Sequence, residues 1–161
     1  MTSPSDIPQI PAFPTPVTFD RLLTLAREQG FLVNDREQRF AQRWDQTVLR
    51  IWIPENRELL LCHATQPGVM LPASRRTSML AFANDWHRDR LWPMVVVADT
   101  EQGLQMHAQM AIDIGAGMTD DQLRTNLSMA QATIRQAVSA FNHTFRIAPP
   151  EGSAAAQDGQ P

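Results

Sequence analysis

Hydrophobic residues in this chain recur at two different spacings, and the changes between them set the order of its helices and strands. After Thr18, spacings of three and four predict a first helix that ends near Gly30. From Phe31 to Gln66 the spacing becomes two, with turn residues at Asp45-Gln46 and from Pro54 to Arg57. This stretch predicts three antiparallel strands, at residues 39–44, 47–53 and 58–65.

The rest of the pattern predicts two more helices and two more strands. A helix is expected from Ser74 to Arg90, strands over 94–99 and 104–112, and a last helix behind the capping-box residues Thr119 to Gln122. The predicted fold is a single α+β domain with an antiparallel five-stranded sheet and helices packed on it, in the order α-β-β-β-α-β-β-α. Three helices cover only one face of such a sheet, so the other face or an edge strand must be shielded differently.

The two ends of the chain differ from the middle in composition. Five of the 12 prolines fall between Pro4 and Pro16, so residues 1–16 are predicted to form a flexible arm. Residues 148–161 are small and polar and are predicted to be a disordered tail. The folded α+β domain is therefore expected at residues 17–147. We expect no signal peptide and no membrane span.

Charge and cysteine content restrict the class of partner. The net charge is −3 and the isoelectric point is near 5.7, which disfavours nucleic acid as a partner. Cys62 is the only cysteine and lies among leucines, so we expect it to be buried and reduced. These features predict a cytoplasmic protein.

No group of residues carries a recognisable catalytic or metal-binding pattern. The four histidines are scattered, and His63 can approach His107 only if their strands are neighbours. Cys62 and His63 are adjacent in a strand and point to opposite faces, which excludes a nucleophilic pair. The glycines Gly115 and Gly117 suit a turn better than an anion site. We therefore predict no catalytic residues, no metal site and no cofactor.

Two alternatives to protein binding remain open from the residues. One is a small-molecule site or active site between the second helix and the sheet, lined by Met79, Trp86 and Met106 with His107 at its rim. The other is nucleic-acid binding, which would need arginines gathered on one face despite the acidic total.

Two stretches of sequence resemble a known family. Asn84-Asp85-Trp86-His87, followed by Leu91-Trp92-Pro93 and a hydrophobic strand, is similar to the N-x-W-N…W-P segment of the YbjN-domain proteins, bacterial sensory-transduction regulators. The stretch from Gly117 to Leu123 is similar to the G-x-T-x-x-x-L pattern with which the last helix of that family begins. His87 departs from the family, which commonly has asparagine at that position.

The resemblance implies a fold like that of type III secretion chaperones, which commonly dimerise and bind other polypeptides. It implies no catalytic residues. Five residues of the motif would have structural roles, with Trp86 filling the gap between helix and sheet and Asn84 bonding backbone near the turn into Pro93. The five residues are Asn84, Trp86, Pro93, Gly117 and Thr119.

The prediction for function is a non-enzymatic protein-binding or regulatory module whose partner the sequence does not identify. A homodimer, or pairing with a similar chain, is the leading assembly, with a contact surface at the start of the second helix. That surface comprises Arg75, Arg76, Met79 and Leu80. If the chain is instead monomeric, outward polar residues such as Gln105, His107 and Gln109 would keep the bare face soluble for a different partner.

Overall fold

The computed structural model of the chain describes residues 13–34, 37–55 and 58–149. Most of the predicted N-terminal arm and C-terminal tail, residues 1–12 and 150–161, lies outside the described residues. The domain boundaries at residues 17 and 147 therefore stay a prediction.

The described residues contain six strands in one antiparallel sheet, one strand more than predicted. The additional strand is β1 (Leu32–Asn34), which pairs with the first half of β2. Three residues are too few to display an alternating pattern, so the prediction of five strands was wrong at this point. The five predicted strands are all present: β2 (Arg39–Trp44), β3 (Thr47–Trp52), β4 (Leu59–Thr65), β5 (Met94–Thr100) and β6 (Gly103–Asp113).

The strands lie in the order β1-β2-β3-β4-β6-β5, so β6 lies between β4 and β5. The predicted turn at Asp45-Gln46 joins β2 to β3. Pairing of β4 with β6 places Cys62 opposite Met110 and His63 opposite Gln109. The two edges of the sheet are the short strand β1 and the longer strand β5.

Two of the three helices begin at the predicted capping residues. The side chain of Thr18 accepts a hydrogen bond from Arg21 N at the start of α1 (Phe19–Glu28). Thr119 and Gln122 form the predicted capping box at the start of α3 (Asp120–Phe145). Gly30, just after α1, has a φ of +75°, which suits a residue without a side chain.

The helix between the two sheet segments starts later than predicted. A single 3-10 turn, η1 (Ala73–Arg75), follows Pro72, and Arg75 N donates to the Pro72 carbonyl at 2.9 Å. The α-helix α2 then runs over Arg76–Asp89, whereas the sequence pattern predicted Ser74 to Arg90. Short turns of this kind carry no hydrophobic period, so the spacing of apolar residues does not distinguish them from the helix.

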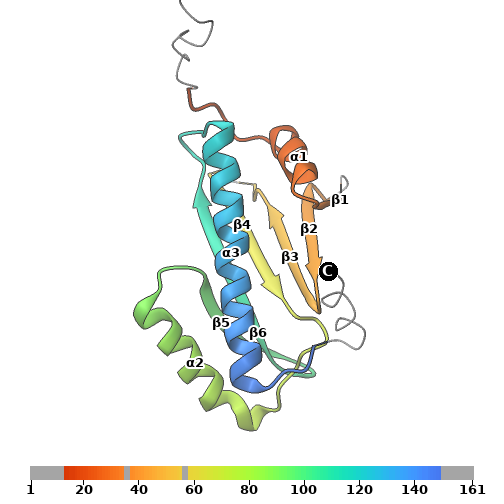
Figure 1. Cartoon of the computed structure of the whole chain (residues 1–161), viewed down its shortest axis with the longest axis vertical. Coiled ribbons are helices and arrows are strands. Elements are labelled where there is room, and N and C mark those ends of the chain that lie inside the picture. The colour runs from red at the N-terminus through yellow and green to blue at the C-terminus, as the bar shows by residue number, and fades with distance from the viewer. Residues whose placement is uncertain (1–12, 35–36, 56–57, 150–161) are drawn as a thin grey trace, which may run out of the picture.

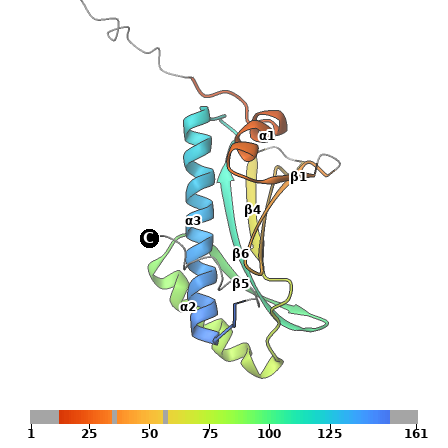
Figure 2. The same ribbon diagram turned by 45° about the vertical axis from the view of Figure 1, so that its right-hand side comes forward.

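All three helices lie on the same face of the sheet (Figure 1). In Figure 2, where the molecule is turned by 45°, α3 and α2 lie on one side of the strands and no helix covers the other side. Residues between the layers form one core that includes Phe40, Leu60, Ile134 and Phe141. The prediction that helices cover one face only is confirmed. No described helix is both long enough and apolar enough to cross a membrane.

Cys62 lies in this core, as predicted. It is 1% exposed, and burial raises the pKa of its thiol to about 12. A thiol that stays protonated at neutral pH is a poor nucleophile. Cys62 is therefore a packing residue.

Candidate protein-binding surface

The strands present one face that no described helix covers, and we name it the open face. Residues paired across neighbouring strands point to the same side, so the strand register defines its members. The open face comprises Leu32, Arg39, Ala41, Arg43, Val48, Arg50, Trp52, Leu59, Leu61, His63, Thr65, Met94, Val96, Ala98, Thr100, Gln105, His107, Gln109, Ala111 and Asp113.

Both edges of the open face end in exposed apolar side chains. Leu32 on β1 is 67% exposed and Met94 on β5 is 47% exposed. One row of paired residues joins them across all six strands: Leu32, Ala41, Arg50, His63, Gln109 and Met94. The face thus offers exposed apolar side chains together with polar ones, a mixture that is common in surfaces that contact another polypeptide.

Three arginines lie together on β2 and β3. Arg50 pairs with Ala41, and Arg39 and Arg43 stand two residues to either side of Ala41 on the same face. The guanidinium group of Arg39 lies 5.5 Å from the centre of the Trp52 ring and 3.9 Å from the Glu37 carboxylate. None of these three arginines was predicted as a site residue, although Arg39, Ala41 and Arg43 follow one another at a spacing of two along β2, which places them on one face.

Next to the arginines, two histidines are hydrogen-bonded to each other. Because β4 pairs with β6, His63 Nε2 lies 3.0 Å from His107 Nδ1. His107 Nε2 lies 3.0 Å from Gln105 Oε1, and Gln105 Nε2 donates to the Gln66 carbonyl. Since Gln105 Oε1 only accepts, His107 carries its proton on Nε2, and its Nδ1 accepts from His63. The condition that the sequence left open, that the two strands are neighbours, is therefore met.

Both histidines are neutral at pH 7 in this arrangement. Burial, His107 and Arg50 lower the pKa of His63 from 6.5 to about 4. Burial also lowers the pKa of His107. The hydrogen bonds also require a neutral His107, because a proton on its Nδ1 would face the donor of His63. The described residues hold no cluster of three or more His, Cys, Asp and Glu side chains that could share a metal ion.

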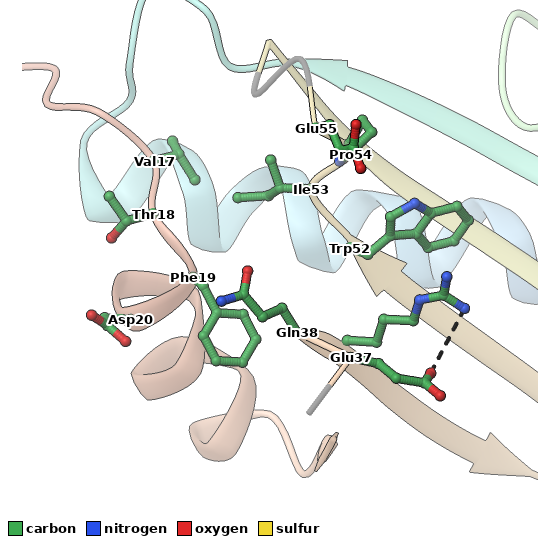
Figure 3. A pocket seen from close by; sticks show the side chains of 11 residues that line it. Val17, Thr18, Phe19, Asp20, Glu37, Gln38, Trp52, Ile53, Pro54 and Glu55 are labelled. Atoms are coloured by element: carbon green, nitrogen blue, oxygen red, sulfur yellow. Dashed lines mark ion pairs between the residues drawn. The ribbon is translucent and has the colours of Figure 1, made fainter. Parts of the chain in front are cut away.

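A hollow of about 840 Å³ adjoins the open face where β2 and β3 meet α1. Figure 3 shows Phe19 from α1 and Trp52 from β3 on two sides of it, with the ion pair of Arg39 and Glu37 drawn as a dashed line. Asp20 and Glu55 also line it. The walls come from α1 and the ends of β2 and β3, so the hollow is separate from the predicted small-molecule pocket.

The residues of that predicted pocket do not form a site. Met79, Trp86 and Met106 are each at most 5% exposed and pack in the core between α2 and the sheet. His107 follows Met106 in the strand and therefore points to the open face, away from the other three. The prediction of a pocket beside Trp86 with His107 at its rim was therefore wrong.

The predicted contact surface at the start of α2 is divided between core and solvent. Arg75, Arg76 and Leu80 are exposed, and Arg76 is paired with Asp99 of β5. Met79 is 1% exposed and belongs to the core, so it is not available to a partner. Whether the exposed part of this surface binds another chain stays a prediction.

The first motif segment holds the end of α2 to the start of β5. Trp86 is 5% exposed, and its Nε1–H donates to the Pro93 carbonyl at 3.0 Å. Val95 N donates to His87 Nε2 at 2.8 Å, so the histidine offers an acceptor at the position where the family commonly has an amide. Asn84 is exposed and makes no side-chain hydrogen bond to the described residues. The backbone bonds that we expected from Asn84 come from Trp86 and His87.

The second motif segment holds the chain in front of α1 against the start of α3. Thr15 and Met118 exchange two backbone hydrogen bonds, at 3.2 and 2.9 Å. Gly117 has a φ of +77°, and a side-chain carbon there would lie 2.6 Å from the Thr15 carbonyl oxygen. Arg21 donates to the carbonyls of Thr15, Pro16 and Met118. Gly117 thus permits a close backbone approach, and Thr119 caps the helix.

The solved structures that are similar to this one include the following two. "Crystal structure of YbjN, a putative transcription regulator from E. coli" superposes with a TM-score of 0.67 at 15% identity, over 82% of this chain and 96% of that chain. "Structure of the HopA1-SchA Chaperone-Effector Complex" gives a TM-score of 0.53 at 17% identity, over 80% of this chain and 99% of that chain. No curated protein matches. At these identities the likeness establishes the fold.

A family profile identifies the chain more directly. Residues 15–143 match the family YbjN, described as "Putative bacterial sensory transduction regulator". The match begins at Thr15, where the described contacts with Met118 begin, and covers both motif segments. This chain belongs to the YbjN family.

Proposed function

We propose that this chain is a non-enzymatic module that binds another polypeptide on the open face of its sheet. The observation that carries the proposal is the face itself: no described helix covers it, and apolar, aromatic and charged side chains lie partly exposed along it. Protein surfaces with a sizeable apolar patch rimmed by polar groups are frequently interaction sites. The likeness in fold to a chain of a chaperone–effector complex supports a polypeptide as the ligand.

A regulatory role follows if binding on this face controls the partner. The family description supports such a role, and the thiol of Cys62 is buried and protonated, so it is not an activated nucleophile. Binding alone would then change the partner's availability or conformation.

Substitutions of exposed apolar side chains test the proposed surface. Leu32→Ser with Met94→Ser removes such groups from the two edges of the open face. Met129→Ser is the control and removes a similar group, 39% exposed, from the helix side. Polypeptides retained from native extract by the immobilised parent should be lost with Leu32→Ser and Met94→Ser and kept with Met129→Ser. Equal retention by both variants would contradict binding on the open face.

We also propose that two copies of the chain pair through the start of α2. Leu80 is exposed there, and Leu91 and Trp92, which follow α2, are 89% and 42% exposed. Arg75 is exposed as well and is available to a carboxylate of a second copy. Pairing at α2 leaves the open face uncovered for a different partner.

A further inference from the structure

Some of the described arginines are ion-paired and others are not, and the helices hold both kinds, since Arg27 and Arg135 have no ion pair with a described residue. Four helix arginines each lie beside an aspartate: Arg21 beside Asp120, Arg76 beside Asp99, Arg88 beside Asp85 and Arg124 beside Asp121. On the open face, Arg39 reaches only Glu37 at 3.9 Å, and neither Arg43 nor Arg50 has an ion pair with any described residue. The open face therefore carries positive charge on β2 and β3, although the whole chain has a net charge of −3.

The other half of the open face is largely apolar, and Asp113 at the end of β6 is its one charged side chain among the described residues. Leu61 on β4, Ala111 on β6 and Val96 on β5 are partly exposed, and Met94 extends the apolar surface to the sheet edge. His63 and His107 lie between the two halves, are hydrogen-bonded to each other, and are neutral at pH 7 because their pKa values are lowered. The face thus has a cationic half and an apolar half.

We infer that the open face binds an acidic, amphipathic segment of a partner polypeptide, with carboxylates on Arg43 and Arg50 and apolar side chains on Leu61, Val96 and Met94. The inference rests on the proposed function and specifies the chemistry of the partner. Guanidinium groups without carboxylate partners attract carboxylates by charge and by paired hydrogen bonds. A nucleic acid would satisfy the arginines, but it has no apolar side chains to place on Leu61 and Met94, and the net negative charge of the chain opposes its phosphates.

The register also sets the spacing within such a segment. Arg50 and Met94 belong to one row and are separated by three strand-to-strand steps, a distance of roughly 14 Å. An extended chain rises roughly 3.3 Å per residue. An acidic residue should therefore precede or follow an apolar residue by about four positions.

Binding of a labelled synthetic peptide tests the inference. The probe is a 12-residue fluorescein peptide with two glutamates placed four positions from a leucine and a valine. Its twins carry glutamine or lysine in place of glutamate, and a single-stranded dT oligonucleotide represents nucleic acid. Fluorescence anisotropy measures each affinity for the parent, for Arg43→Gln with Arg50→Gln, and for a control of equal charge, Arg27→Gln with Arg146→Gln, at exposed positions outside both proposed surfaces. Circular dichroism melts check that each variant folds.

We expect the acidic peptide to bind the parent about tenfold more tightly than its glutamine twin, and to lose about tenfold in affinity with the Arg43 and Arg50 changes. The Arg27 and Arg146 control should bind the acidic peptide within about twofold of the parent. Equal affinity for the glutamine twin would overturn the preference for acidic segments and leave polypeptide binding intact. If the oligonucleotide binds more tightly than the acidic peptide and Arg43→Gln with Arg50→Gln abolishes that binding, the inference of an acidic segment is overturned in favour of nucleic acid. Failure of every peptide to bind would overturn both the inference and binding on this face.

Discussion

At the scale of single residues, Trp86 connects α2 to the chain that leads into β5. Its ring stacks on Phe82 with centroids 6.4 Å apart, the Arg90 guanidinium lies 4.3 Å from its centre, and its N–H bonds to the Pro93 carbonyl. Trp86→Ala should lower the free energy of unfolding by about 3 kcal/mol or more, because it opens a cavity and leaves a buried carbonyl without its donor. Urea unfolding measures the change.

Trp86→Phe is the matched control for that experiment. It keeps an aromatic ring in the core and removes only the N–H donor and part of the volume, so the loss should be about 1 to 2 kcal/mol. If Trp86→Ala unfolds at the urea concentration of the parent, Trp86 is not a core residue.

The histidine pair predicts a pH dependence of stability. The unfolded chain protonates His63 near pH 6.5, whereas the folded protein does so only near pH 4. Between these values the unfolded state binds more protons, so stability should fall as the pH is lowered from 6.5 to 4. His63 is partly exposed, and with solvent screening its share should be roughly 1 to 2 kcal/mol.

His63→Gln tests this expectation, because glutamine retains a donor toward His107 and does not titrate. The difference in unfolding free energy between parent and variant should shrink or reverse in favour of the variant from pH 7 to pH 4.5. His107→Gln should likewise make the free energy of unfolding less dependent on pH between pH 7 and pH 4.5. Parallel stability curves for parent and variants would show that the folded state does not resist protonation of these rings.

At the scale of elements, the start of α3 is joined to the chain that precedes α1. A side chain at position 117 would meet the Thr15 carbonyl at 2.6 Å and would also strain the backbone at a φ of +77°. Gly117→Ala should therefore cost about 1 to 3 kcal/mol in thermal or urea unfolding. Gly68→Ala is the control, since a side-chain carbon there meets nothing within 4 Å. Equal stability of both variants would mean that the contact between Thr15 and Met118 contributes nothing.

Local sequence patterns were sufficient to predict most helices and strands. They were insufficient to predict which side chains meet on the open face. Capping at Thr18 and Thr119 and the alternation in β2 to β6 depend on neighbouring residues, so these features were predictable. β1 was missed because pairing with β2 creates it. The pair of His63 and His107 depends on β4 lying beside β6, which no local pattern reports. Likewise, nothing in the sequence around Asn84 indicated that Trp86 and His87 would make the backbone bonds expected of it.

At the scale of the whole molecule, the proposed pairing of two copies predicts a mass near twice 18.1 kDa in solution. Light scattering across a micromolar dilution series measures this mass. Leu80→Arg should return the mass to that of one chain, because it places a charge in the proposed contact, whereas the same change at Met129, on α3, should not. A mass near 18.1 kDa for the parent at every concentration would contradict the dimer and leave the open face as the remaining candidate surface.

Photo-cross-linking in native cells tests most directly whether the open face binds a polypeptide. A photo-reactive amino acid at Gln109 lies between His63 and Met94 on the open face, and the same amino acid at Gln136 is exposed on α3. We predict a discrete cross-linked polypeptide from position 109 that is absent from position 136. Cross-links from position 136 and none from position 109 would contradict the assignment of the open face as the binding surface.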